Sequence, residues 1–596
     1  FNGRLAGLSA INGKGNPGTA AIIRISGFGS INAGSEPLYV IDGMISNAAQ
    51  FGALDPTSVE SVDILKDAAA GAIYGSRAGN GVIVVTTKKG KSGQARFSYN
   101  ATAGIQEVSK KVELLDSKGY IEFAKEGYRN ENKPIPEYLN ASYPNTDWQD
   151  EIFRTAPFQN HQLSVSGGTD KIKYYLSGNI LDNQGVIITT SYKRYSSNGS
   201  LNIELNPKLK VGLTYNAAFI KQRVNPNMGG PGHGVGYYGI SGGIMEQTIW
   251  FLPIIPVYQE DGDYGTYYNG QLAGHQGWVG YGNPVANLLE TKDIVADNNV
   301  MGRAYLNYEI IKGLTFNTSF TGSSYTSFRE YYVSPYLEGA GSRFANYSNP
   351  RYENIQSGQS HNTSTYWISD AFLQYRRSIN DHQFDVMAGY SREFRQSRST
   401  SASSSANDRG QANALNPIPA FMNDLRPNIF GSSLILGGAG FGENTFESGF
   451  ARLNYSYNEK YIFMAALRRD GSSKFAPDVR WGTFPAVSAA WRISQESFME
   501  KASWINELKL RASYGVSGND QFGNYSWQGK VNYGRLYTYG PIAGGGAGTV
   551  NALEPSTIEN KNLKWETNEQ VNIGLDFSGA NNRISLTADY FIRNTK

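Results

Sequence analysis

The sequence has no cysteine, no long apolar run and little net charge, and each absence narrows the class of protein. Without cysteine the chain forms no disulfide and carries no thiol nucleophile, although this assigns no compartment. No stretch of about 18 apolar residues occurs, which argues against a helical membrane protein. The mean hydropathy of -0.42 agrees with this. A formal net charge of +3, without basic clusters among aromatic residues, argues against nucleic-acid binding.

The sequence motifs of catalysis and of metal or nucleotide binding are also missing. No Gly-x-Ser-x-Gly elbow occurs. Glycines 75, 79 and 81 resemble a phosphate loop, but no Gly-Lys-Ser/Thr follows them, so they predict tight turns. Asp261-Gly262-Asp263 lacks the longer pattern of a calcium loop and also predicts a turn. Metal-binding spacing is absent among the five histidines, which are His161, His233, His275, His361 and His382. We therefore predict no enzyme, no catalytic residue, no metal site and no cofactor.

Alternating apolar and polar residues fill most of the chain from residue 94 onward. In the last run, Ile584, Leu586 and Tyr590 alternate with Ser585, Thr587 and Asp589. Successive side chains of a strand point to opposite faces, so one face is apolar and the other polar. Such runs are joined in pairs by short turns rich in Asn, Asp and Gly, which favour tight hairpins. The best turns are at 206–208, 312–313, 380–381, 458–459 and 581–582.

The other connections are long, and they predict a membrane barrel. Short turns at one rim and long loops at the other are typical of outer-membrane β-barrels. The high counts of Gly (68), Tyr (39) and Phe (28) suit tight hairpins and interfacial aromatic belts. A soluble β-sandwich also alternates, but it seldom runs so many successive hairpins with all long loops on one side. The long connections are roughly 109–158, 224–292, 329–361, 399–443 and 519–564.

We therefore predict a transmembrane antiparallel β-barrel over residues 94–596. About fifteen strands are counted by this pattern. An unclosed barrel leaves a strand edge unpaired, which lipid does not tolerate. We therefore expect further strands to be missing at the C-terminal end.

Residues 1–93 have a mixed pattern and predict a separate α+β domain. Strands are expected at 20–26, 37–41 and 81–88. Asp55-Pro56 predicts a helix start, with Val59, Val62, Ile64 and Leu65 following, and Asp67 predicts the cap of a second helix over 68–74. A wide barrel has a lumen that its own side chains cannot fill. This domain is therefore expected to plug the lumen.

The plug pattern closely resembles one family. The matching stretches are 37–43 (PLYVIDG), 59–67 (VESVDILKD), 72–77 (AIYGSR), 80–82 (NGV) and 86–90 (TTKKG). They resemble the plug of SusC/RagA-like TonB-dependent transporters of Bacteroidetes, and barrel segments such as 145–150 and 163–168 match as well. The motif residues carried over from this resemblance are Asp42, Gly43, Asp67, Tyr74, Gly75, Arg77 and Gly81.

The resemblance implies an outer-membrane importer. It implies a 22-stranded barrel, a signal peptide, an N-terminal extension and a TonB box in a complete member. The implied partners are outer-membrane lipid, a SusD-like lipoprotein lid over the extracellular loops, and TonB with ExbB/ExbD, which pulls on the plug from the periplasmic side of the short turns. The implied cargo is an oligosaccharide, with oligopeptides as the alternative. A passive porin or adhesin on the same barrel is a further alternative.

Candidate ligand contacts lie in the aromatic and Gly-rich loop 224–292. Flat aromatic faces suit stacking on sugar rings, although the same side chains can instead pack the loop onto itself or onto a lid. The candidates are Trp250, Tyr258, Tyr264, Tyr267, Tyr268 and Trp278. In the plug, Asp42 and Asp67 with Arg77 are expected to form polar contacts, and carboxylate–guanidinium pairs against the barrel wall are expected to break when the plug moves.

Overall fold

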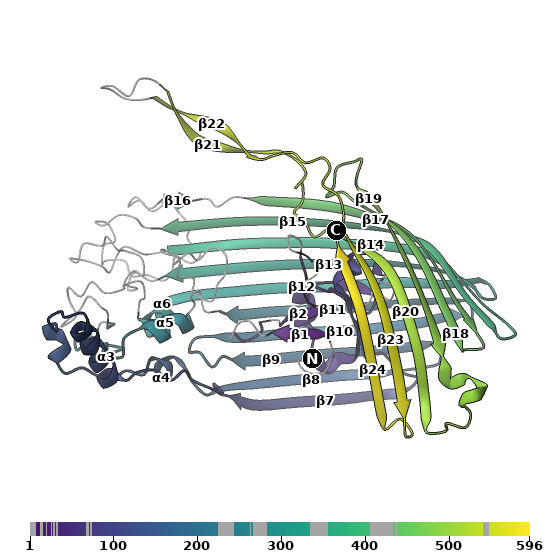
Figure 1. Ribbon diagram of the computed structural model, residues 1–596, viewed down its shortest axis with the longest axis horizontal. Helices are drawn as coiled ribbons and strands as arrows, with labels where there is room; N and C mark the ends of the chain where they lie inside the picture. Colours follow the sequence, from purple (N-terminus) through teal and green to yellow (C-terminus); the bar gives the residue numbers. More distant parts are fainter. Residues whose placement is uncertain are drawn as a thin grey trace.

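A long curved sheet surrounds a small N-terminal domain in the computed structural model of the chain (Figure 1). The strands of the small domain lie inside the curve, so we call the two parts the barrel and the plug. The structure describes residues 7–11, 16–19, 21–25, 27, 30, 34–66, 71, 74–224, 244–262, 264–265, 283–333, 356–405, 433–435, 439–539 and 548–596.

The barrel is an antiparallel sheet in which fifteen strands within the described residues follow one another from β7 to β24. This agrees with the predicted count. The strands are β7 (Gly93–Gln106), β8 (Ala156–Gly168), β9 (Ile172–Gln184), β10 (Ser191–Asn206), β11 (Leu209–Arg223), β12 (Thr291–Ile311), β13 (Leu314–Val333), β14 (Gln356–Ile379), β15 (His382–Ser405), β17 (Gly440–Tyr457), β18 (Tyr461–Ser472), β19 (Trp481–Arg492), β20 (Ile505–Asn519), β23 (Glu566–Gly579) and β24 (Ile584–Thr595). The short strand β16 (Ser433–Ile435) pairs with β15 beside this path.

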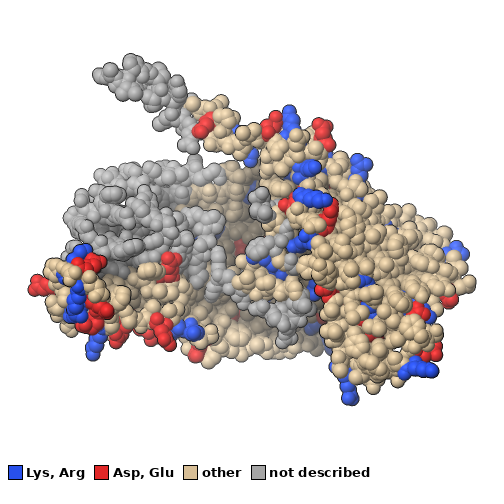
Figure 2. Space-filling view, viewed as in Figure 1, with Lys and Arg blue, Asp and Glu red and all other residues tan. Residues whose placement is uncertain are grey.

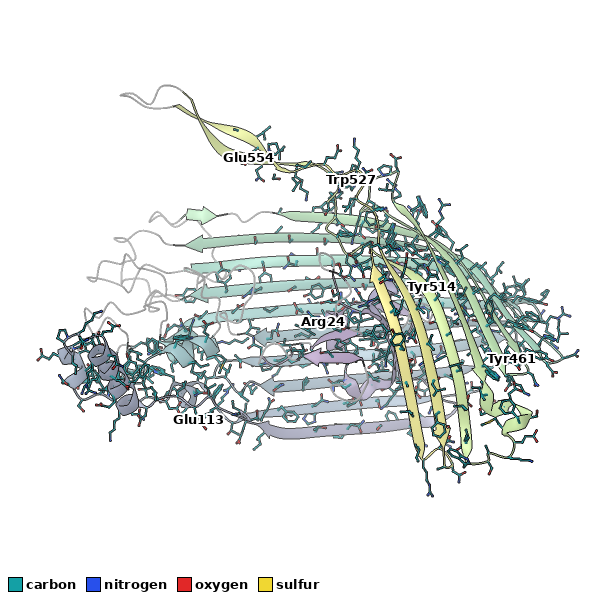
Figure 3. The ribbon with its side chains drawn as sticks, viewed as in Figure 1. Arg24, Glu113, Tyr461, Tyr514, Trp527 and Glu554 are labelled. Atoms are coloured by element: carbon teal, nitrogen blue, oxygen red, sulfur yellow. The ribbon has the colours of Figure 1, made fainter. Side chains whose placement is uncertain are left out.

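All five predicted hairpin turns are confirmed. They join β10 to β11, β12 to β13, β14 to β15, β17 to β18 and β23 to β24. Asn380, Asn458, Asn581 and Asn582 have positive φ angles between 50° and 61°, as tight turns require. The short turns lie at one rim, where Tyr461 stacks on Tyr457 with ring centroids 6.4 Å apart (Figure 3).

The barrel wall is apolar outside and polar inside. On β8, Leu163 is 59% exposed while the preceding Gln162 is 1% exposed. On β9, Leu176 is 47% exposed while Ser177 is 2% exposed. Figure 2 shows a mainly uncharged outer surface over the C-terminal strands, with charged residues gathered toward its ends. The predicted alternation is thus present with the expected orientation, the reverse of a soluble protein.

The long connections carry their own structure. The first contains α3 (Ser117–Asn130), η4 (Glu137–Asn140) and α4 (Trp148–Ile152), and the second pairs α5 (Ile244–Trp250) with α6 (Pro284–Glu290). The buried Trp148 joins these two connections, because its ring contacts Phe251 edge-on at 4.8 Å and its Nε1 donates a hydrogen bond to the Leu252 carbonyl at 2.9 Å.

The C-terminal part of the chain has smaller elements between its strands. Single turns η8 (Ile493–Gln495) and η9 (Ser497–Met499) follow β19. A hairpin of β21 (Lys530–Tyr539) and β22 (Gly548–Thr557) extends away from the sheet (Figure 1). Among the described residues, none of these helices is long and apolar enough to span a membrane.

The plug has a four-stranded sheet in the order β4-β3-β6-β5, with β3 and β6 parallel. Its core contains Ile41, Met44 and Val85, each fully buried, and Met301 of the barrel packs against it. Its elements are β1 (Leu8–Ile11), β2 (Ile22–Ile25), β3 (Leu38–Ile41), β4 (Met44–Ser46), α1 (Ala48–Ala53), η1 (Pro56–Ser58), β5 (Val59–Leu65), η3 (Ser76–Asn80) and β6 (Val82–Thr87). The predicted strands at 20–26, 37–41 and 81–88 correspond to β2, β3 and β6.

The predicted helix after Asp55-Pro56 is wrong beyond its first turn. Asp55 does cap η1, since its carboxylate accepts a hydrogen bond from the Thr57 amide at 3.1 Å. The chain then becomes strand β5, where Val62 and Ile64 pair with Val85 and Ile83 of β6. β-branched residues favour the pleated strand, and pairing with β6 satisfies the backbone groups there. Most of the second predicted helix, including Asp67, lies outside the described residues.

Candidate functional site at the contact between plug and barrel wall

Arg77 of the plug forms an ion pair with the barrel wall. It belongs to η3, whose flanking Gly75 and Gly81 have φ angles of 98° and 84°, so the interpretation of these glycines as turn residues is confirmed. Its Nη2 donates a hydrogen bond to Oε1 of Glu393 on β15 at 2.5 Å. The guanidinium also lies 4.5 Å from the ring centroid of Phe446 on β17, the residue opposite Glu393 across the two strands. The Arg77 side chain is therefore bound both by the Glu393 carboxylate and by the Phe446 ring.

This ion pair is buried. The side chains of Arg77 and Glu393 are 14% and 4% exposed. Burial lowers the pKa of Arg77, but the nearby Glu393 and Asp520 carboxylates and Tyr366 raise it more, so its net pKa lies above the ordinary value. The guanidinium therefore stays charged, and the plug cannot leave the wall without separating two buried charges.

Two plug glycines let arginines of the wall approach the backbone. At Gly75 a Cβ atom would lie 3.0 Å from Nη2 of Arg468 on β18. At Gly43, where φ is 81°, a Cβ atom would lie 2.9 Å from Nη1 of Arg303 on β12. A side chain at either position would push against a wall arginine. These two motif positions are therefore contact points as well as turns.

Asp42 organises the plug itself. Its carboxylate accepts hydrogen bonds from the amide and the hydroxyl of Thr87, at 2.9 and 2.7 Å, which ties the end of β3 to the end of β6. Its backbone carbonyl accepts a hydrogen bond from Nη1 of Arg303 at 3.3 Å. The expected polar contact is therefore present, but the partner of Asp42 is Thr87, while Arg77 pairs with Glu393. Tyr74 is half-buried against Val40, Ala78 and Val82.

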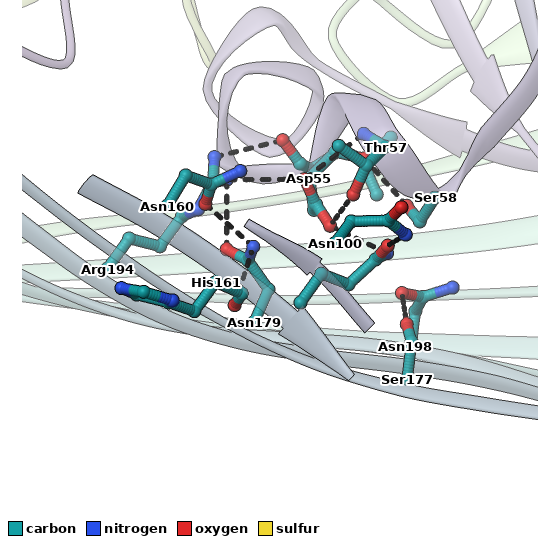
Figure 4. Close-up of polar contacts among 12 residues, drawn as sticks. Asp55, Thr57, Ser58, Asn100, Asn160, His161, Ser177, Asn179, Arg194 and Asn198 are labelled. Carbon is teal, nitrogen blue, oxygen red and sulfur yellow. Dashed lines mark hydrogen bonds and ion pairs between the residues drawn. The ribbon is translucent and has the colours of Figure 1, made fainter. Parts of the chain in front are cut away.

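A second contact, which sequence reasoning missed, centres on Asp55 (Figure 4). Besides capping η1, its carboxylate accepts a hydrogen bond from Nε2 of Gln162 on β8 at 2.9 Å. It also lies 4.0 Å from Nη2 of Arg194 on β10, which donates through Nη1 to the Leu54 carbonyl at 2.9 Å. The side chains of Asp55 and Arg194 are 2% and 4% exposed. An Asp before Pro signals a helix cap, and nothing in the local sequence shows that the same carboxylate also binds the wall.

A third contact lies at the C-terminal side of the sheet. The carbonyl of Gly34 accepts hydrogen bonds from Asn80 of the plug at 2.9 Å and from Asn519 of β20 at 3.4 Å. Ser30 donates to the Glu566 carboxylate of β23 at 2.6 Å. Polar contacts thus attach the plug to strands from β8 to β23, which is most of the width of the sheet.

Comparison with known proteins agrees with this architecture. The family model described as "TonB dependent receptor-like, beta-barrel" matches residues 256–596, more than half of the chain. The model described as "TonB-dependent Receptor Plug Domain" matches residues 2–82. The chain belongs to the TonB-dependent receptor family. The predicted domain boundary at residue 93 stays a prediction, since the plug match ends at 82 and β7 begins at Gly93.

The receptor is similar to SusC-like proteins of Bacteroidetes. It is 30% identical to TonB-dependent receptor SusC of Bacteroides thetaiotaomicron and 32% identical to TonB-dependent receptor P3 of Formosa agariphila, over the whole of this chain and 57% and 54% of those proteins. It therefore spans about half the length of the curated relatives that it matches. Among solved structures, that of the RagAB peptide transporter superposes with a TM-score of 0.81 at 24% identity, over 100% of this chain and 65% of that one. These findings confirm the family resemblance and the fold of barrel and plug.

The receptor's candidate ligand contacts fall into two groups. Trp250 and Tyr258 are 62% and 50% exposed, so the Trp250 ring and the face of the Tyr258 ring turned away from Tyr264 are available. Tyr264 is less so, because it stacks on Tyr258 at 5.2 Å and donates a hydrogen bond to Glu290 at 3.0 Å. The neighbouring Phe251 is buried, which agrees with the alternative that such aromatics pack the loop. Tyr267, Tyr268 and Trp278 lie outside the described residues. In the part of the chain that is described, no group of three or more His, Asp or Glu residues is placed to hold a metal.

Proposed function

We propose that this chain forms the plug and much of the barrel of a TonB-dependent importer of oligosaccharides in the outer membrane. The observation that carries the proposal is the mode of plug attachment, in which the Arg77 and Asp55 contacts are polar and ionic. Water can replace such contacts when the plug moves, whereas a large apolar seam would resist hydration. The motif residues Asp42, Gly43, Asp67, Tyr74, Gly75, Arg77 and Gly81 are proposed to position the plug.

The proposed partners follow from the family. TonB, energised through ExbB/ExbD, pulls on the plug from the periplasm, where the short turns lie. A SusD-like lipoprotein covers the long loops at the extracellular rim. The apolar outer wall contacts outer-membrane lipid, and no nucleic acid is involved. The curated relatives carry the names of receptors, and the absence of enzymatic activity stays a prediction.

Deleting TonB in the host is expected to abolish accumulation of the cargo, because plug displacement needs external work. The measurement is uptake of labelled oligosaccharide by cells that carry or lack TonB, with surface binding recorded separately. Binding is expected to remain when uptake is lost. Undiminished uptake without TonB would overturn the importer and favour the alternative of a passive porin or adhesin.

The oligosaccharide proposal draws on the exposed aromatic rings. Replacing Trp250 with alanine is expected to weaken oligosaccharide binding about tenfold, which corresponds to about 1.4 kcal/mol, because a flat stacking face is lost. Calorimetry of the purified receptor with its lid measures this change. The matched control is Ile249→Ala on the same helix, where an exposed apolar side chain is removed without loss of a ring. Equal affinities of the Trp250→Ala and unmodified proteins would remove Trp250 from the ligand site.

An oligopeptide importer is the second candidate. The observation that favours it is the structural similarity to the RagAB peptide transporter. The same calorimetry, run in parallel with neutral oligosaccharide and mixed peptide pools, separates the two. If only the peptide pool gives a heat of binding, the oligopeptide importer replaces the oligosaccharide importer as the proposed function.

A further inference from the structure

Unpartnered polar atoms gather on one part of the inner wall. On β9, β10 and β11, the side chains of Tyr175, Ser196, Asn198, Ser200 and Asn216 each have a buried nitrogen or oxygen atom without a hydrogen-bond partner among the described residues. At Asn216 both amide atoms are unpartnered. Tyr175, Asn198, Ser200 and Asn216 are all at most 8% exposed. Buried polar groups normally find partners, so this grouping is unusual for a surface that serves only as a wall.

These five side chains form one continuous face, which we call the amide–hydroxyl face. Tyr175 lies opposite Ser200 in the register of β9 and β10, and Asn198 lies opposite Asn216 in the register of β10 and β11. Residues directly opposite each other in a sheet point to the same side. The free donors and acceptors therefore point together toward the plug.

Helix α1 of the plug covers the part of this face that contains Ser196, Asn198 and Asn216. A pocket lies between them, lined by Gln50 and Ala53 of the helix and by Ser196, Asn198 and Asn216 of the wall. Beside the pocket, Nε2 of Gln50 donates a weak hydrogen bond of 3.5 Å to Asn299 of β12. The helix leaves these hydrogen-bonding groups unused, while its C-terminal end is fastened to Arg194 of β10 through the Leu54 carbonyl. Its departure would uncover the unused groups.

The side chains of the face differ in chemistry from those of the wall around Glu393. The five side chains of the face carry amide and hydroxyl groups and no formal charge, and the Arg194–Asp55 ion pair borders them at the end of α1. On β15 and β18, by contrast, Glu393 pairs with Arg77, and Arg468 pairs with Asp470 at 2.7 Å. Amides and hydroxyls both donate and accept, so they match a ligand whose surface alternates donors and acceptors without charge. Sugar hydroxyl groups have that property.

We propose that the amide–hydroxyl face is a contact surface for a neutral oligosaccharide in transit, covered by α1 in the closed receptor and uncovered when the plug moves. This rests on the proposed import function. It places the path of the cargo along β9–β11 and leaves the wall around Glu393 to hold Arg77. Binding at the extracellular loops precedes this contact and does not depend on it.

The absence of cysteine from the chain allows a direct test. A single thiol is placed on the face by Asn198→Cys, and its rate of labelling by a small hydrophilic maleimide is measured in energised cells. Because α1 covers Asn198 until the plug moves, oligosaccharide added to energised cells is expected to raise the labelling rate at least threefold, whereas a peptide pool is expected to leave the rate unchanged. The matched control is Asn572→Cys on β23, away from the face. Asn572 is another buried amide of the inner wall, and its side-chain oxygen is also unpartnered. Its labelling rate is expected not to respond to oligosaccharide.

Alanine variants give an independent readout. Asn198→Ala and Asn216→Ala are expected to slow oligosaccharide uptake about threefold to tenfold each, the effect of one hydrogen bond, while calorimetric affinity at the loops stays unchanged. Asn572→Ala is expected to transport normally, and the amount of folded protein in the outer membrane is compared for all variants.

Each failure has a distinct meaning. An unchanged labelling rate of the Asn198→Cys thiol after oligosaccharide is added would show that the face stays covered during transport and would overturn the proposal. A rise with peptides alone would show that the ligand is a peptide. If Asn572→Ala slows oligosaccharide uptake as much as Asn198→Ala does, the effect comes from general destabilisation and the proposal is overturned. A rise in labelling with oligosaccharide, together with uptake that is independent of TonB, would contradict the importer but not the uncovering of this face.

Discussion

Replacing Arg77 with alanine is expected to loosen the plug from the barrel wall by about 3–5 kcal/mol, the usual cost of removing one partner of a buried ion pair. Glu393, with a side chain 4% exposed, would lose its ion-pair partner. The contact with the Phe446 ring would disappear as well. The measurement is native-state hydrogen exchange of the plug amides in detergent, since exchange through plug opening reports its free energy directly.

Two further variants separate charge from geometry at this contact. Arg77→Lys keeps the charge but loses the planar guanidinium that both binds Glu393 and covers Phe446, so an intermediate loss is expected. Combining Arg77→Ala with Glu393→Gln removes the stranded charge and is expected to restore part of the stability. If the double variant is no more stable than Arg77→Ala alone, the buried charge is not the source of the loss. A difference below about 0.5 kcal/mol for Arg77→Ala would show that the pair does not hold the plug.

Replacing Asp55 with alanine is expected to cost about 3 kcal/mol at the other side of the plug, because one carboxylate serves two functions. It caps η1 through the Thr57 amide, and it binds Gln162 and Arg194 of the wall. Arg194 keeps its hydrogen bond to the Leu54 carbonyl, which limits the loss. Hydrogen exchange of the plug and the denaturant midpoint of the whole receptor measure the change.

Controls distinguish the cap from the wall contact. Asp55→Asn retains a good capping oxygen but removes the charge that faces Arg194, so it is expected to retain the η1 turn and lose the wall contribution. Asn47 caps α1 by accepting a hydrogen bond from the Gln50 amide at 2.9 Å. Asn47→Ala should therefore show the cost of a cap alone, about 1 kcal/mol. An Asp55→Ala loss no larger than that of Asn47→Ala would mean that Asp55 does not fasten the plug.

Strand and turn positions in the barrel were predictable because their causes are local. Leu163 and Gln162 are neighbours in sequence, yet the Leu163 side chain lies on the outer surface of the wall and the Gln162 side chain faces the lumen. The alternation of apolar and polar residues along each strand therefore shows which side chains face lipid and which face the lumen. The turns at Asn458 and Asn581 are equally local, because a positive φ favours Asn at those positions.

The error at β5 has a non-local cause. Val59, Val62, Ile64 and Leu65 follow a capping residue with a spacing that also suits a helix face. Pairing with β6, which lies some twenty residues later in the chain, decides in favour of a strand. Short apolar segments of this kind are ambiguous in sequence, since neighbouring backbone rather than intrinsic preference selects the conformation.

The sequence by itself determined that hairpins of alternating polarity form a membrane-type barrel and that a different, motif-rich domain precedes it. Only the tertiary structure decided which groups join the two parts. The partner of Arg77 is 316 residues away and that of Asp55 more than a hundred, on strands whose inner faces all look alike in sequence. The hydrophobic alternation assigns a side chain to the inside of the wall, and the register between strands and the position of the plug then determine what it touches there.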